Sequence, residues 1–124
     1  MRIYKNKWFT RFARKERISA ARLRKAVEDA EAGKIDADYG GGVIKQRIAR
    51  PGEGKSGGYR TVILYRRGGK AFFVYGFPKS ERDNITGVEE RAFKELAKLV
   101  FGLSDEDLAK LVETGAYEKV EGDD

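Results

Sequence analysis

The middle of the chain places cationic side chains on stretches that favour β-structure. Lys45 and Arg47 are two residues apart in a mostly apolar stretch, so on a strand they share one face, roughly 7 Å apart. Arg60 begins the next such stretch, and Arg82 comes shortly after the third. Guanidinium and ammonium groups in this arrangement can bind a phosphodiester and stabilise charge that develops on it.

The sequence restricts the chemistry that such a cluster could perform. It contains no histidine and no cysteine, which removes the usual general base and the usual zinc ligands. A lysine crowded by other cations has a lowered pKa and can take a proton from a ribose 2′-hydroxyl. The acids expected near the centre are Glu53, Glu81 and Asp83, which form no metal cluster. From the residues alone, a basic binding surface and a basic, metal-free active site both remain open.

Composition and charge favour one compact domain that binds a polyanion. The 124 residues carry a net charge of +6, and residues 1–82 hold 21 Lys and Arg against 8 Asp and Glu. Residues 83–124 hold 5 and 12, so the cations are concentrated in the first two thirds. A basic protein surface suits nucleic acid, although a solvent-exposed surface that carries more cations than anions without binding anything has the same composition. No stretch predicts a membrane span or a signal segment, so we expect a cytoplasmic protein.

The order of predicted elements is strand, two helices, three strands and two helices, which is the α+β class. Short connections predict an antiparallel meander with the helices packed on one face of the sheet. The first strand is expected at an edge, residues 36–42 as a linker, and an acidic tail from about residue 116. The expected strands are 2–4, 43–49, 59–65 and 72–77. The expected helices are 7–15, one between the Ser19 cap and Gly33, one after Thr86-Gly87 that includes Phe93 to Val100, and one between the Ser104 cap and Gly115.

A glycine-rich segment separates the first two central strands. Residues 52–57 match G-x-G-x-x-G, and residues 54–56 resemble the end of a P-loop, but both motifs require a following helix and here a strand follows. The segment is then either a flexible hairpin loop or a mobile arm whose amides and Lys55 contact phosphates.

Aromatic residues on the strands have two possible roles. Phe73 and Phe77 are interpreted as core, because strand aromatics usually fill the core. Tyr59, Tyr65 and Tyr75 are left open between core packing and base stacking.

Four segments together resemble the HigB-like branch of the RelE/ParE toxins of bacterial type II toxin–antitoxin systems. They are KWFTRFAR at 7–14, VIKQRIARP at 43–51, GKSGGYR at 54–60 and YGFPKSERDNI at 75–85. The resemblance covers the chain to about Val120 and implies a single toxin domain, residues 1–124, with a central antiparallel sheet and two N-terminal helices. It further implies a ribosome-dependent endoribonuclease that cuts mRNA in the A site, by metal-independent attack of the 2′-hydroxyl on the adjacent phosphate.

The resemblance also implies roles for individual residues. Lys45 and Arg47 match the basic pair on the strand before the loop, and Arg60 matches the arginine after Gly-Tyr. A catalytic basic residue of well-known members falls at Ser80, so Lys79 or Arg82 must replace it, and their C-terminal tyrosine falls near Thr86. Arg47 is a poor base because arginine stays protonated, which leaves Lys45 as the candidate base. The predicted catalytic residues are Lys45, Arg47, Arg60 and Arg82; the predicted RNA-binding residues are Arg50, Lys55 and Lys79.

The expected partners are a cognate antitoxin, of the helix-turn-helix type in this branch, together with the ribosome and mRNA. No metal, small-molecule cofactor or membrane is expected. Two alternatives remain open: a ParE-like inhibitor that binds DNA gyrase, and a nucleic-acid-binding domain without catalysis.

Overall fold

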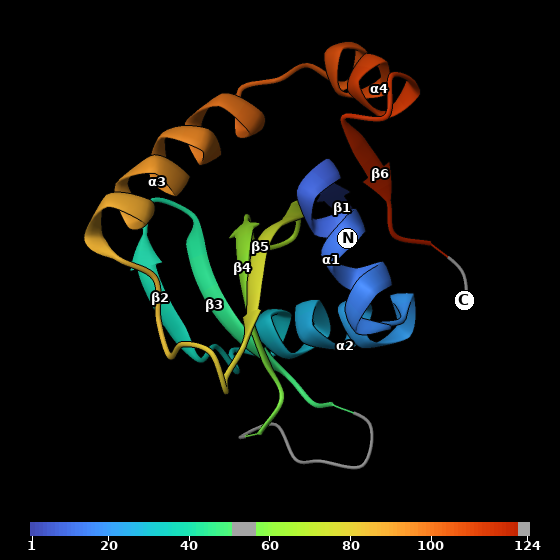
Figure 1. Cartoon of the computed structure of the whole chain (residues 1–124). Coiled ribbons are helices and arrows are strands. Elements are labelled where there is room, and N and C mark those ends of the chain that lie inside the picture. Colours follow the sequence, from blue (N-terminus) through green and yellow to red (C-terminus); the bar gives the residue numbers. More distant parts are fainter. Residues whose placement is uncertain (51–56, 122–124) are drawn as a thin grey trace.

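Six strands form a single sheet in the order β2-β3-β4-β5-β1-β6 (Figure 1). The computed structural model describes residues 1–50 and 57–121. Neighbouring strands run antiparallel except β1 and β5, which are parallel. The elements are β1 (Arg2–Asn6), α1 (Lys7–Glu16), α2 (Ala20–Glu31), β2 (Ala37–Gly40), β3 (Val43–Ile48), β4 (Tyr59–Tyr65), β5 (Lys70–Pro78), α3 (Gly87–Phe101), α4 (Asp105–Glu113) and β6 (Tyr117–Lys119).

The two N-terminal helices begin at side-chain caps that the sequence encodes. The Asn6 carboxamide oxygen accepts the Phe9 amide at 2.8 Å, so α1 starts directly where β1 ends. Ser19 caps α2 by accepting the Arg22 amide at 3.3 Å. Between the helices, Arg17 adopts a left-handed backbone conformation with φ 58°. This conformation ends α1 and turns the chain into α2 within three residues.

Helices α1 and α2 cover one face of the sheet. Leu23 and Val27 of α2 belong to the same buried cluster as Ile44, Ile63 and Phe73 of the strands. The predicted helical spacing of apolar residues in α2 is confirmed by the burial of its inner face.

The opposite face of the sheet packs on the C-terminal helices. Ala97 and Val100 of α3 and Leu108 of α4 form a second cluster with strand residues that include Val62 and Phe72. The prediction that all helices pack on one face was therefore wrong. Strand β4 is buried at every position, because both faces of the central strands are apolar and each requires a covering layer.

Three other details of the sheet differ from the prediction, while the α+β class and the helix order are confirmed. Strand β1 lies between β5 and β6 rather than at an edge. The stretch expected as a linker contains β2, which pairs with β3. The stretch expected as an acidic tail contains β6, and both Tyr117 and Val120 are buried.

Candidate functional site

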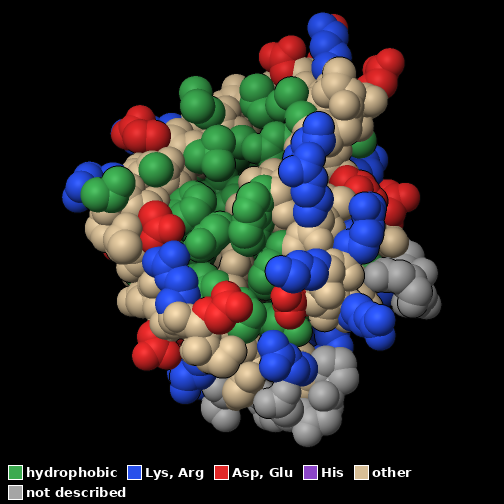
Figure 2. Space-filling model, in the orientation of Figure 1, with side chains coloured by type: hydrophobic (Ala, Val, Ile, Leu, Met, Phe, Trp, Pro, Cys, Tyr) green, Lys and Arg blue, Asp and Glu red, His purple; other side chains and the backbone are tan. Residues whose placement is uncertain are grey.

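Three of the predicted site residues lie on one face of the sheet, at the end of β3 and the start of β4. Arg47 lies directly opposite Arg60, and Lys45 lies opposite Val62. Directly opposed residues point to the same side of a sheet, so the three cations share the face that also carries α3. The Arg47 side chain is 46% exposed and that of Lys45 is 13% exposed, while Arg60 is buried. Figure 2 shows that Lys and Arg side chains lie close to Asp and Glu side chains below a hollow lined with hydrophobic groups.

Asp36 joins two of these cations. Its carboxylate oxygens lie 2.8 Å from Arg47 Nε and 3.6 Å from Lys45 Nζ. The expectation that only Glu53, Glu81 and Asp83 are acids near the centre was wrong, because Asp36 was placed in a linker. A pocket of about 310 Å³ opens beside Asp36 and Arg47. The Lys45 ammonium therefore has a carboxylate neighbour rather than only cations around it.

Gln46 places Asp36 from the other side of the sheet. Its buried amide nitrogen donates to the carbonyls of Ala26 and Lys34, both at 3.0 Å. Its amide oxygen accepts the Asp36 backbone N–H at 2.9 Å. All the hydrogen-bonding groups of this side chain except one lone pair are used, so the backbone at Asp36 is fixed relative to both α2 and β3.

Arg60 is a desolvated guanidinium beside another guanidinium. Burial, followed by the nearby Arg47 charge, lowers the pKa of Arg60 from its ordinary value. Asp36 and Asp83 act in the opposite direction, more weakly. An anion bound between Arg47 and Arg60 would remove this repulsion, so the pair is electrostatically suited to a phosphate group.

Arg82 borders the same face and is held firmly in place. Its guanidinium lies 5.0 Å from the centre of the Phe77 ring, and Phe77 lies opposite Arg60 across β4 and β5. Its Nη2 is 2.6 Å from Glu89 Oε1, and its Nη1 donates to the Tyr75 hydroxyl at 3.2 Å. The hydrogen bond with Glu89 raises the pKa of Arg82. Lys45, Arg47 and Arg60, with Arg82 at the border, are called the cationic face below.

Of the predicted RNA-binding residues, Arg50 lies on the α1 side of the sheet rather than on the cationic face. Arg50 packs over the Tyr59 ring, 5.0 Å from its centre, and its Nη2 lies 3.9 Å from Glu16 of α1. Lys79 is exposed just after β5, where its backbone N–H donates to the Gly58 carbonyl oxygen. Lys55, in the glycine-rich segment, lies outside the described residues.

The tyrosines left open by the sequence divide between the two faces. Tyr59 and Tyr65 are buried on the α1 and α2 side, and their hydroxyls bond Glu16 and Glu31. Tyr75 lies on the other side, partly exposed, with its ring 4.7 Å from Trp8 and its hydroxyl on Arg82. Of the three, Tyr75 is the one placed near the cationic face.

These features define a small α+β protein with a desolvated, cationic sheet face suited to phosphate groups. Comparison with protein families identifies the family: residues 1–120 match the model described as the RelE toxin of the RelE/RelB toxin–antitoxin system. The chain therefore belongs to the RelE toxin family, whose members pair with a cognate antitoxin. Comparison with curated proteins and with solved structures gives no match. None of the helices in residues 1–50 and 57–121 is long and apolar enough to cross a membrane.

Proposed function

We propose that this toxin is a ribosome-dependent mRNA endoribonuclease of the HigB-like branch, acting in the cytoplasm. The observation that carries the proposal is the convergence of Lys45, Arg47 and Arg60 on one sheet face, with Arg82 at its border. Family membership supports toxin activity, and the cationic face supports RNA as the target. The cognate antitoxin would be of the helix-turn-helix type.

Substrate binding would begin with the exchange of one anion for another. Asp36 pairs with both Lys45 and Arg47 in the free protein and offsets part of their positive charge. A phosphate of the mRNA backbone can bind Arg47 and Arg60 together and compete with Asp36 for Arg47. Because Arg60 is already desolvated, its interaction with the incoming charge is stronger than that of an exposed arginine.

The chemistry would be an intramolecular transesterification. Lys45 is the candidate base that accepts the 2′-hydroxyl proton as that oxygen attacks the adjacent phosphorus. The bond to the 5′-oxygen breaks, leaving a 2′,3′-cyclic phosphate and a 5′-hydroxyl that takes a proton from solvent. Arg47, Arg60 and Arg82 stabilise the extra negative charge of the pentacoordinate phosphorus. Glu89 holds the Arg82 guanidinium in its orientation through a 2.6 Å hydrogen bond.

The first prediction is that the cationic face is required for toxicity. Lys45→Ala, Arg60→Ala and Arg82→Ala should each reduce ribosome-dependent mRNA cleavage by roughly a hundredfold or more, as expected when a general base or charge stabiliser is removed. Cleavage is measured by mapping mRNA ends in a reconstituted translation reaction, with growth arrest after induction as the cellular readout. Lys98→Ala is the matched control, because Lys98 is an exposed α3 cation that pairs with the exposed Glu95 at 3.2 Å.

The result also separates the alternatives. If all three variants cleave and arrest growth like the parent protein, the assignment of the site is wrong. Growth arrest with intact mRNA and inhibited DNA supercoiling would instead identify a gyrase inhibitor. Binding of RNA with neither cleavage nor arrest would identify a non-catalytic nucleic-acid-binding domain.

A further inference from the structure

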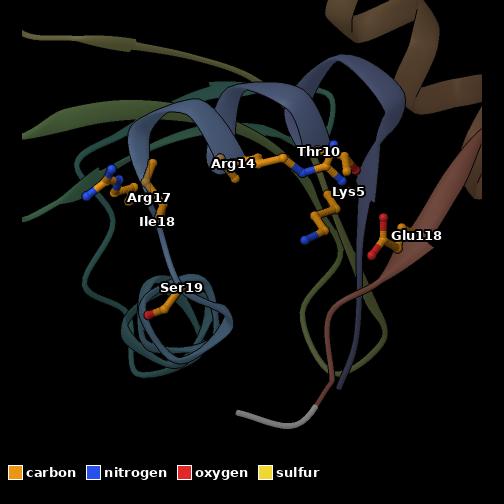
Figure 3. A pocket seen from close by; sticks show the side chains of 8 residues that line it. Lys5, Thr10, Arg14, Arg17, Ile18, Ser19 and Glu118 are labelled. Carbon is orange, nitrogen blue, oxygen red and sulfur yellow. The ribbon is translucent and has the colours of Figure 1, made fainter. Parts of the chain in front are cut away.

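A second cationic hollow lies on the side of the sheet covered by α1 and α2. It is a pocket of about 360 Å³ between the end of α1, the start of α2 and strands β1 and β6. Figure 3 shows the side chains that line it, including Lys5, Arg14, Arg17, Ser19 and Glu118. This pocket contains none of the residues of the cationic face.

The local fold explains why cations collect there. Along β1, Tyr4 packs with Phe72 on the α3 side, so the next residue, Lys5, points toward α1 and α2. Arg14 and Arg17 are in the last turn and the C-cap of α1. The left-handed backbone at Arg17 is held by its own N–H, which donates to the Arg14 carbonyl at 3.3 Å. This turn places both arginines along the pocket, with their side chains pointing in opposite directions (Figure 3).

The cations of this pocket differ from those of the cationic face in their ion pairing with the described residues. Within the described part of the chain, Lys5, Arg14 and Arg17 form no ion pair, whereas Lys25, Lys45, Arg47 and Arg82 each pair with an acid. Among the described residues that line the pocket, Glu118 is the one acid, against three cations. The pocket is also next to the N-terminus of the 12-residue helix α2, whose dipole adds positive potential.

We propose that this pocket binds a phosphate group, supplied either by an RNA backbone or by free phosphate. Figure 3 shows the Arg14 guanidinium on the same side of the pocket as Lys5, so these two groups can donate to one tetrahedral anion, while Arg17 on the other side adds positive potential. The Ser19 hydroxyl oxygen accepts the Arg22 amide, which leaves its own proton able to donate to the anion. The proposal does not depend on ribonuclease activity, because the pocket shares no residue with the cationic face.

The test uses two pocket variants and one matched control in the full chain. Arg17→Gly removes a guanidinium but places glycine where φ is 58°, so the turn between α1 and α2 is retained and the thermal midpoint should stay the same or rise. Arg14→Gln removes the second guanidinium. Lys15→Gln makes the same charge change at an exposed α1 residue that does not line the pocket.

Two probes distinguish the sources of phosphate. Inorganic phosphate is titrated while NMR follows the amides of residues 17–19, and binding of a 2′-O-methyl RNA, which cannot be cleaved by its 2′-oxygen, is measured by fluorescence anisotropy. Each pocket variant should weaken RNA binding roughly three- to tenfold at low salt and reduce the slope of log affinity against log salt by about 0.7, with little effect of Lys15→Gln. Lys45→Ala should leave the amide shifts caused by phosphate unchanged.

The outcomes decide the proposal. Phosphate-induced shifts with unchanged RNA affinity in both pocket variants would support the pocket and identify free phosphate as its ligand. Absence of saturable shifts at residues 17–19, or equal effects of the pocket and control variants, would overturn the proposal.

Discussion

The Asp36 carboxylate reduces the positive charge of the cationic face in the free protein. Asp36 contacts both Lys45 and Arg47, and Gln46 fixes its backbone. Like charges opposed across two strands destabilise a sheet, so the Arg47–Arg60 pair needs an anion nearby. Asp36 provides that anion in the free protein, and the substrate phosphate would provide it in the complex.

The ion pair between Arg82 and Glu89 makes the stability of the fold depend on pH in the acid range. The Arg82 hydrogen bond, followed by the Thr86 backbone N–H, lowers the pKa of Glu89 to about 2. An acid with a depressed folded-state pKa stabilises the fold above its unfolded pKa of about 4.5, and this contribution is lost as the pH falls toward 2. Glu89→Gln should therefore lower the free energy of unfolding at pH 7 by about 1–2 kcal/mol and remove this part of the acid dependence.

Urea unfolding between pH 7 and pH 2 measures both effects. Glutamine can still accept the Thr86 N–H of the capping box, so the variant isolates the charge. Glu95→Gln serves as the control, because Glu95 forms an exposed pair with Lys98 that should contribute less than about 0.5 kcal/mol. Parallel pH profiles for the parent and Glu89→Gln would show that the pair does not couple to folding.

Sequence periodicity predicted which side chains share the face, but not what surrounds them. The two-residue period of a strand placed Lys45 and Arg47 on the same face. The register between β3 and β4 places Arg60 opposite Arg47 on that face. Asp36 was missed because its position depends on β2, whose sequence Ala-Asp-Tyr-Gly has little intrinsic strand preference. A tertiary contact, the Tyr39 hydroxyl with the Asn84 side chain, helps to hold that strand.

At the scale of elements, the close approach of β3 and β4 depends on one glycine. A Cβ atom at Gly58 would lie 2.1 Å from the Ile48 carbonyl oxygen and 2.8 Å from the Arg50 amide nitrogen. Both atoms are backbone, so the strands must separate to accept it. Gly58→Ala should cost roughly 3 kcal/mol or more of unfolding free energy and displace the start of β4, where Arg60 lies.

Thermal and urea unfolding test this prediction against Gly69→Ala. A Cβ at Gly69 meets its nearest atom at 3.5 Å, an ordinary contact, and should change stability by less than about 0.5 kcal/mol. Equal stability of the two variants would contradict the close approach.

The elements with strong internal patterns were predicted, and those defined by their partners were not. The apolar spacing of α2 and the Gly68–Gly69 hairpin are properties of short sequence stretches. Strand β6, with the sequence Tyr-Glu-Lys, carries two charges in three residues and becomes a strand because β1 offers an unpaired edge. The second helical layer was indicated by the apolar residues on both faces of β5, but the prediction assigned all helices to one face.

At the scale of the molecule, the last strand ties the basic and acidic parts of the chain together. Tyr117 is buried and its ring lies 5.5 Å from that of Phe72, in the second cluster. Arg2 and Lys70 also pair with Asp105 at the start of α4. The charge asymmetry between residues 1–82 and 83–124 therefore does not divide the structure into separate units.

Tyr117→Ala should destabilise the whole fold by about 3–5 kcal/mol, because a large buried aromatic is lost from the cluster beneath α4. Chemical denaturation followed by far-UV circular dichroism gives the free energy of unfolding. Lys119→Ala, an exposed change on the same strand, should have an effect below about 0.5 kcal/mol. A loss of similar size in both variants would mean that the backbone pairing of β6, rather than the Tyr117 ring, carries its contribution.

The position of β1 between β5 and β6 has a consequence for how the protein is made. Strand β1 receives its neighbours only after residues 70–78 and then 117–119 have been translated. A nascent chain therefore lacks the finished sheet until β6 has been synthesised. For the proposed inhibitor of translation, this order postpones the complete fold until β6 is available to pair with β1.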